Sequence, residues 1–66
     1  MKFKCRLKVI FAELEIKQGD FAKRIGIDDS TLSSLVKNRT TPRFDTAYRI
    51  AQELGKPIEE IWTIEE

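Results

Sequence analysis

The feature that most constrains this sequence is Gly26, which lies between two short segments, 18–25 and 29–37, that both carry apolar residues at helical spacing. Glycine adopts a positive φ without the penalty that a Cβ imposes, so this position permits a tight turn. Ala22, four residues earlier, is small enough to let the two segments approach closely. The stretch therefore predicts two short helices joined by a tight turn, a helix-turn-helix.

Helices are also predicted on both sides of this pair. Apolar residues recur at i, i+3, i+4 and i+7 in two further segments, which predicts amphipathic helices over about 4–15 and 45–54. Gly55 ends the second of these, and a last short helix is predicted at about 58–62. The β-branched residues are too scattered to predict a sheet. We therefore expect an all-α fold, a compact five-helix bundle that forms one domain over residues 1–66.

Several residues have predicted structural roles beside these helices. Asp28 is placed to cap the helix at 29–37 through its side-chain oxygen. Asn38 can take the left-handed conformation that ends the same helix. Phe21 and Phe44 are expected in the core, because both stand at apolar-periodic or junction positions.

Charge is distributed unevenly along the chain, although the net charge is only +1. Residues 1–43 hold ten Lys and Arg against five Asp and Glu, whereas residues 44–66 hold two against six. A chain with one basic and one acidic part can bind a polyanion with the first and turn the second away. Ordinary surface scatter of charge is an alternative interpretation.

The sequence gives little support for catalysis. It contains no histidine, and its one cysteine, Cys5, has neither a disulfide partner nor a histidine to activate it. We therefore expect no enzyme, no cofactor and no metal site. The longest apolar run is four residues, far too short for a signal peptide or a membrane span, so we expect a cytoplasmic protein without a membrane partner.

The segment from Arg6 to Trp62 resembles the Cro/repressor (XRE) family of helix-turn-helix transcription regulators. The motif that carries the resemblance consists of Gln18, Ala22, Gly26, Ile27, Leu32 and Leu35. The resemblance implies a lambda-repressor-like bundle of five helices whose third helix enters the DNA major groove. It also implies binding to double-stranded DNA at a pseudo-palindromic operator, commonly as a homodimer, with no small-molecule ligand evident.

Residue roles follow from the resemblance position by position. Base contacts are implied for Asp29, Ser30, Ser33 and Ser34. Phosphate contacts are implied for Gln18, Lys17, Lys37, Asn38, Arg39, Thr40, Thr41 and Arg43, and the turn for Gly26. These residue types suit the roles, because Lys, Arg, Asn, Gln and Thr commonly bind phosphate, whereas serines read bases without strong preference. The operator sequence is therefore not predicted.

Two questions stay open at this stage. Trp62 is expected either to cover the first helix or to join Ile58 and Ile61 in a dimer contact. Asp29 is expected either to accept a hydrogen bond from a cytosine amine or to weaken binding by repelling phosphate. The aspartates, together with an acidic C-terminal part, favour an alternative function, a protein-interaction module on the same fold. That acidic part contains Glu59, Glu60, Glu65 and Glu66.

Overall fold

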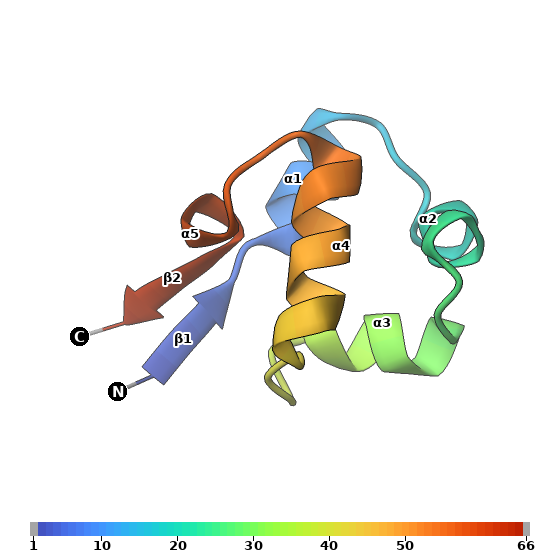
Figure 1. Ribbon diagram of the computed structural model, residues 1–66. Helices are drawn as coiled ribbons and strands as arrows, with labels where there is room; N and C mark the ends of the chain where they lie inside the picture. Colours follow the sequence, from blue (N-terminus) through green and yellow to red (C-terminus); the bar gives the residue numbers. More distant parts are fainter. Residues whose placement is uncertain (1, 66) are drawn as a thin grey trace.

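The computed structural model describes residues 2–65, which form five helices and a two-stranded sheet (Figure 1). The helices are α1 (Leu7–Glu13), α2 (Gln18–Ile25), α3 (Asp29–Val36), α4 (Phe44–Leu54) and α5 (Ile58–Ile61). The strands are β1 (Lys2–Cys5) and β2 (Trp62–Glu65). Each predicted segment contains a helix. The first helix is shorter than predicted, because residues 2–5 form a strand.

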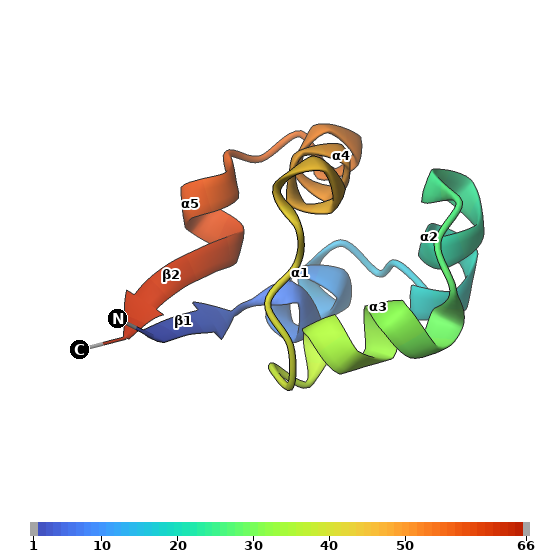
Figure 2. The same ribbon diagram turned by 60° about the horizontal axis from the view of Figure 1, so that its bottom comes forward.

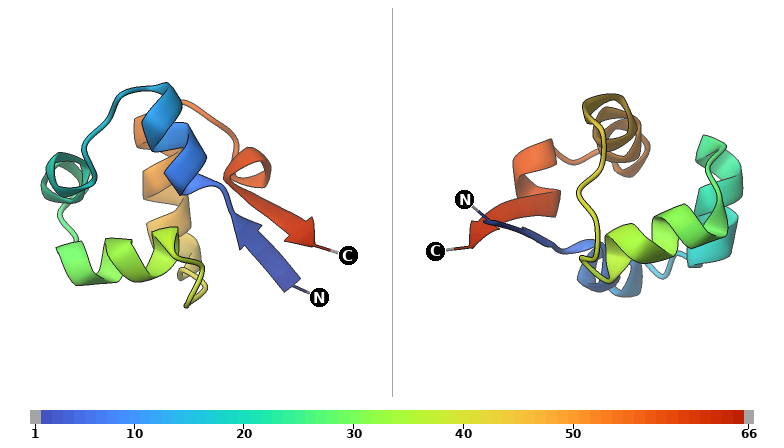
Figure 3. Two further views of the ribbon diagram at one scale, coloured as in Figure 1. Left: turned by 180° about the vertical axis from the view of Figure 1, so that it is seen from behind. Right: turned by 90° about the horizontal axis from the view of Figure 1, so that it is seen from below.

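The sheet contradicts the prediction of an all-α fold. β1 pairs antiparallel with β2, with Lys2 opposite Glu65 and Cys5 opposite Trp62, so the two ends of the described chain lie side by side (Figure 3). The strands are four residues each and lie far apart in the sequence. Each strand alternates polar and apolar residues over only four positions, so the pairing depends on the helical bundle bringing the two strands together.

The core is formed mainly by the helices, and β2 adds one residue to it. Its buried residues are Leu7, Ile10, Phe11, Phe21, Ala22, Ile25, Leu32, Leu35, Ala47, Ile50, Ala51, Ile61 and Trp62. The core position of Phe21 is confirmed, and its ring centroid lies 5.1 Å from that of Phe11. Phe44 was wrongly predicted, since it is 77% exposed. It stands in the first turn of α4 on the rim of an apolar groove beside Phe3 and Ile58.

Each of the first four helices is followed, within two residues of its last residue, by a residue with positive φ. These residues are Glu15 (55°), Gly26 (75°), Asn38 (61°) and Gly55 (68°). In each case the next N–H donates to a carbonyl five residues back, which satisfies a helix-end acceptor. The four bonds run from Ile16 to Phe11 (2.9 Å), Ile27 to Ala22 (3.0 Å), Arg39 to Ser34 (2.9 Å) and Lys56 to Ala51 (3.1 Å). The left-handed conformations predicted for Gly26 and Asn38 are confirmed.

Asn38 also connects α3 to the sheet. Its side-chain Oδ1 accepts a hydrogen bond of 3.2 Å from the backbone N–H of Cys5. The Cys5 side chain is half-buried, and this burial raises the pKa of its thiol, although the backbone N–H of Leu7 opposes the shift. A thiol that stays protonated near neutral pH suits a packing role. Among residues 2–65, no helix is long and apolar enough to cross a membrane.

Candidate nucleic-acid interface

The helix-turn-helix predicted from the sequence forms one end of the molecule. α2 and α3 pack against each other, and α3 lies across the face that Figure 2 and the right-hand view of Figure 3 bring forward. Gly26 makes the turn at a φ of 75°, and Ala22 is 1% exposed where the helices meet. Leu32 and Leu35 fix α3 on the core. The remaining circumference of α3 is free to meet another molecule.

The outward face of α3 consists of small hydroxyl side chains. Since an α-helix turns 100° per residue, Ser30 and Ser34 lie on the side opposite Leu32, one turn apart. Ser30 is exposed, and Ser33 and Ser34 are half-buried. Lys37 follows Ser34 on nearly the same line. Short side chains along this line allow the helix backbone to come close to a flat or grooved partner.

Asp29 does not lie on this outward face. A Cβ placed on Gly19 would lie 3.6 Å from Oδ1 and 3.9 Å from Oδ2 of Asp29, so its carboxylate lies against the first turn of α2. A carboxylate near the N-termini of both α2 and α3 is favourable, because both helix ends carry partial positive charge. The sequence grouped Asp29 with Ser30 and Ser34, and the packing of α2 on α3 separates it from them.

Asp28 takes the N-cap position of α3, as predicted, with an extended backbone (φ −69°, ψ 144°). Its side chain makes no capping hydrogen bond, so the predicted means of capping is wrong. Both aspartates are exposed. They make the N-terminal end of α3 acidic, and Gln18 and Lys17 lie nearby at the start of α2, where Gln18 is half-buried and Lys17 exposed.

The segment after α3 is basic and solvent-exposed. Its exposed predicted phosphate contacts are Lys37, Asn38, Arg39, Thr40, Thr41 and Arg43. The Oδ1 atom of Asn38 is already bonded to β1, which leaves its amide N–H₂ as a donor. Arg43 Nε lies 3.7 Å from Oδ1 of Asp45, but both side chains are largely exposed (88% and 69%), so this pair is weak and Arg43 remains available.

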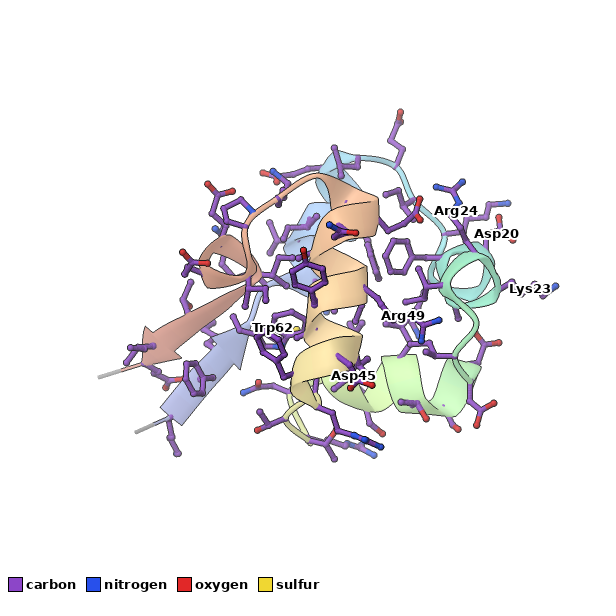
Figure 4. All side chains as sticks on the ribbon, in the orientation of Figure 1. Asp20, Lys23, Arg24, Asp45, Arg49 and Trp62 are labelled. Atoms are coloured by element: carbon purple, nitrogen blue, oxygen red, sulfur yellow. The ribbon has the colours of Figure 1, made fainter. Side chains whose placement is uncertain are left out.

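The fold brings two further cations to this side of the molecule that the sequence did not single out. Arg49 extends from α4 toward the turn, and its Nη2 lies 3.9 Å from where a Cβ of Gly26 would be (Figure 4). Lys2 of β1 lines a hollow together with Arg39 and Thr40. Both placements depend on tertiary packing, and the second depends on the unpredicted sheet.

Other cations lie at the margin of the interface. Arg24 pairs with Glu53 at 3.4 Å and so ties α2 to α4, whereas Lys23 points away from the body of the molecule (Figure 4).

The predicted dimer contacts lie mostly inside the chain. Ile61 is 0% and Trp62 7% exposed, so both belong to the core of a single copy. Of the two expectations for Trp62, the one that the structure supports is that it covers the first helix, because it is buried in the same cluster as Leu7 of α1. Ile58 is half-buried and lines two apolar hollows beside α4. Of the three residues, Ile58 is therefore the one with surface to offer a partner.

Comparisons with known proteins agree with this arrangement. A family model described as helix-turn-helix matches residues 7–61. A protein of Methanothermobacter thermautotrophicus is 38% identical over 55 residues, which cover 82% of this chain and 80% of that protein. One from Archaeoglobus fulgidus is 33% identical over 61 residues, covering 92% and 86%. Both are described as uncharacterized HTH-type transcriptional regulators.

A solved structure supports the fold independently of close sequence similarity. A protein from Bacteroides fragilis, described as a putative DNA-binding protein, superposes with a TM-score of 0.83 over 92% of this chain and 98% of that one, at 23% identity. The family match extends over most of the chain and includes the turn, α3 and the residues that hold them. The chain therefore belongs to the Cro/repressor (XRE) family of helix-turn-helix proteins.

Proposed function

We propose that this protein is a sequence-specific DNA-binding transcriptional regulator that places α3 in the major groove. The observation that carries the proposal is the outward line of α3, where Ser30 and Ser34 leave room for close approach and exposed cations follow directly. The major groove is about 12 Å wide and accepts an α-helix. The HTH-type transcriptional regulators among its relatives support the same function.

The residues of this surface divide into two roles. Ser30 and Ser34 meet base edges, with Ser33 at the side of the contact. Phosphates are held after α3 by Lys37, Arg39 and Arg43 and by the polar groups of Asn38, Thr40 and Thr41, and before it by Lys17 and Gln18. Because phosphate contacts set position and affinity more than sequence preference, these two sets have separable effects. Asp29 acts as a positioning residue between α2 and α3.

The regulator acts as a homodimer on a pseudo-palindromic operator, with half-sites about 34 Å apart, one turn of DNA. Occupying the operator blocks polymerase, so we propose repression in the cytoplasm. A second function is favoured by one observation, the exposed acids at the head of α3 and on α5 and β2. These acids suit a protein-interaction module that binds DNA weakly.

Titration into random-sequence duplex DNA at low and moderate salt, followed by selection of enriched sites, tests the proposal. A regulator binds with strong salt dependence, because each phosphate contact releases counterions, and the selection enriches an inverted repeat. Binding without enrichment would reduce the protein to a non-specific DNA binder. Absence of binding at low salt would contradict the proposal and favour the protein-interaction module.

A further inference from the structure

β2 has backbone groups that the chain itself does not pair. The register continues past the strands, where the N–H of Arg6 donates to the carbonyl of Ile61 at 2.8 Å. In an antiparallel ladder, successive residues turn their backbone groups to alternate sides. The backbone groups of positions 61, 63 and 65 therefore face β1, whereas the N–H and carbonyl of Ile64 point away from β1. No other strand lies on that side among residues 2–65.

The opposite edge of the sheet is closed. Phe3 and Cys5 both turn their backbone N–H and carbonyl groups away from β2. The N–H of Cys5 already donates to Oδ1 of Asn38 at 3.2 Å. The end of α3 thus covers part of the β1 edge. Along β2, the N–H of Trp62 is bonded to the carbonyl of Ile58 in α5. The free part of the sheet edge is the segment around Ile64.

An exposed apolar pair lies beside this free edge. Directly opposed residues of a sheet share a face, and alternate pairs share it again. Phe3 and Ile64 therefore lie on the same face as Cys5 and the buried Trp62, but they are 40% and 57% exposed. The apolar face of the sheet continues from the core into solvent and stops at an unpaired strand.

We propose that β2 pairs antiparallel with β2 of a second copy of this chain, about a two-fold axis at Ile64. Ile64 and its counterpart then exchange both backbone hydrogen bonds, and the two small sheets become one of four strands. On the apolar face, Phe3 and Ile64 of each copy form one continuous row. This inference rests on the proposed function, because it names the surface that joins the two copies of the regulator.

The charges on the two strands favour β2 over β1 as the edge that a second copy joins. On the polar face, this register places Glu65 opposite Thr63 of the second copy, while Lys2 of its own chain lies on its other side. The equivalent pairing through β1, about Phe3, would place Lys2 directly opposite Lys4 of the other copy. Directly opposed like charges destabilise a strand pair. The β2 edge is therefore the self-complementary one.

Sedimentation equilibrium of the protein without DNA tests this pairing over a wide range of concentration. The wild-type protein is expected to show a concentration-dependent dimer. Ile64→Pro removes the backbone N–H that donates to the Ile64 carbonyl of the second copy. It leaves the backbone groups that face β1 intact. Losing this symmetric pair of bonds should raise the dimer dissociation constant about tenfold or more. Leu14→Ser, which removes an exposed apolar side chain at the end of α1 that is far from β1, should leave the dissociation constant unchanged.

A second variant distinguishes loss of the dimer contact from unfolding of the sheet, which proline could also cause. Ile64→Lys keeps every backbone group and places like charges opposite each other across the two-fold axis, so it should also yield monomers, with thermal unfolding close to that of wild type. A wild-type protein that stays monomeric at all concentrations would overturn the proposal. So would a dimer that both Ile64 variants leave intact. Since no DNA is present, either result is independent of whether the protein binds an operator.

Discussion

The two ends of α3 differ in charge. Both charges stabilise the helix, but only the basic end favours DNA binding. At the N-terminal end, Asp28 and Asp29 are exposed, and the Asp29 carboxylate lies against the first turn of α2. At the C-terminal end, Lys37 and Arg39 are exposed beyond the last turn. Acids at a helix N-terminus and bases at its C-terminus both stabilise the helix through its dipole.

Toward DNA the two ends act in opposite directions. Phosphates are attracted to the basic end and repelled by the acidic one, so an arrangement that suits the helix at both ends suits DNA at only one. The protein is therefore expected to hold DNA mainly from the loop after α3. The N-terminal end contributes through Lys17 and Gln18 and is opposed by the aspartates.

Removing charge from the basic end should have the largest effect on DNA binding. Arg39→Ala combined with Arg43→Ala should lower the affinity for random DNA on the order of tenfold to a hundredfold at moderate salt. The slope of log K against log[salt] should become shallower by about 1.8, since each phosphate contact contributes about 0.9. Fluorescence anisotropy at several salt concentrations measures both quantities.

Lys56→Ala is the matched control, because Lys56 follows the far end of α4 whereas Arg43 precedes its start. It removes one positive charge without touching the proposed surface, and the slope should stay unchanged. An unchanged slope in the double variant would show that the loop does not hold phosphate.

The turns that follow α1 and α2 differ in the residue that takes the positive φ, Glu15 in the first and Gly26 in the second, and this difference can be tested by stability. Gly26→Ala forces a Cβ into a φ of 75°, but the nearest atom, Nη2 of Arg49, would be 3.9 Å away, so no clash arises. The cost should be the conformational one alone, about 1 kcal/mol of the free energy of unfolding, measured in urea. The reciprocal variant Glu15→Gly should stabilise by a similar or smaller amount, because Glu15 has a φ of 55°. A cost at Gly26 of several kcal/mol would mean that packing at the turn is tighter than these distances indicate.

The turn at Gly26 was predictable from the sequence, whereas the position of Asp29 was not. Gly26, Ala22 and the two leucines of α3 act within about fifteen residues, so local spacing contained the information. Asp29 is one residue from Ser30, and only the packing of α2 on α3 shows that it faces Gly19. Local pattern predicts which helix forms and leaves open which side chains of its first turn point outward.

The sheet was missed for a related reason. Its strands pair residues near opposite ends of the chain, and β1 has alternating Lys and apolar residues that also fit the start of a helix. Phe44 fitted the apolar period of α4 but is exposed, since it lies on the rim of a groove with Phe3 and Ile58 and not inside the core. In each case the deciding contact is non-local.

Neutralising the acidic end should have a smaller effect, of opposite sign. Asp29→Asn removes a negative charge near the DNA backbone and should raise the affinity for random DNA about two- to fivefold, with a salt slope close to that of wild type. The same change should lower the free energy of unfolding by about 0.3 to 1 kcal/mol, because a charge favourable to both helix N-termini is lost. Glu59→Gln on α5 makes the same change of charge away from α3 and should leave the affinity for random DNA unchanged. Weaker binding by Asp29→Asn to the selected site alone would instead assign Asp29 to a base.

The smallest effect is expected between the two ends, on the outward line of α3. Ser34→Ala removes one hydroxyl from a half-buried position and leaves every charge in place. The affinity for random DNA and the salt slope should not change, because neither depends on base contacts.

Discrimination at one base pair of the selected operator should fall by up to about 1 kcal/mol, the low end of the range for a direct base contact. Competition between the selected operator and its single-base variants measures this loss, with Thr63→Ala on β2 as the control hydroxyl. If discrimination is lost evenly at all positions, Ser34 supports the placement of α3 and does not read a base, and the specificity of the middle of the helix then rests on Ser30.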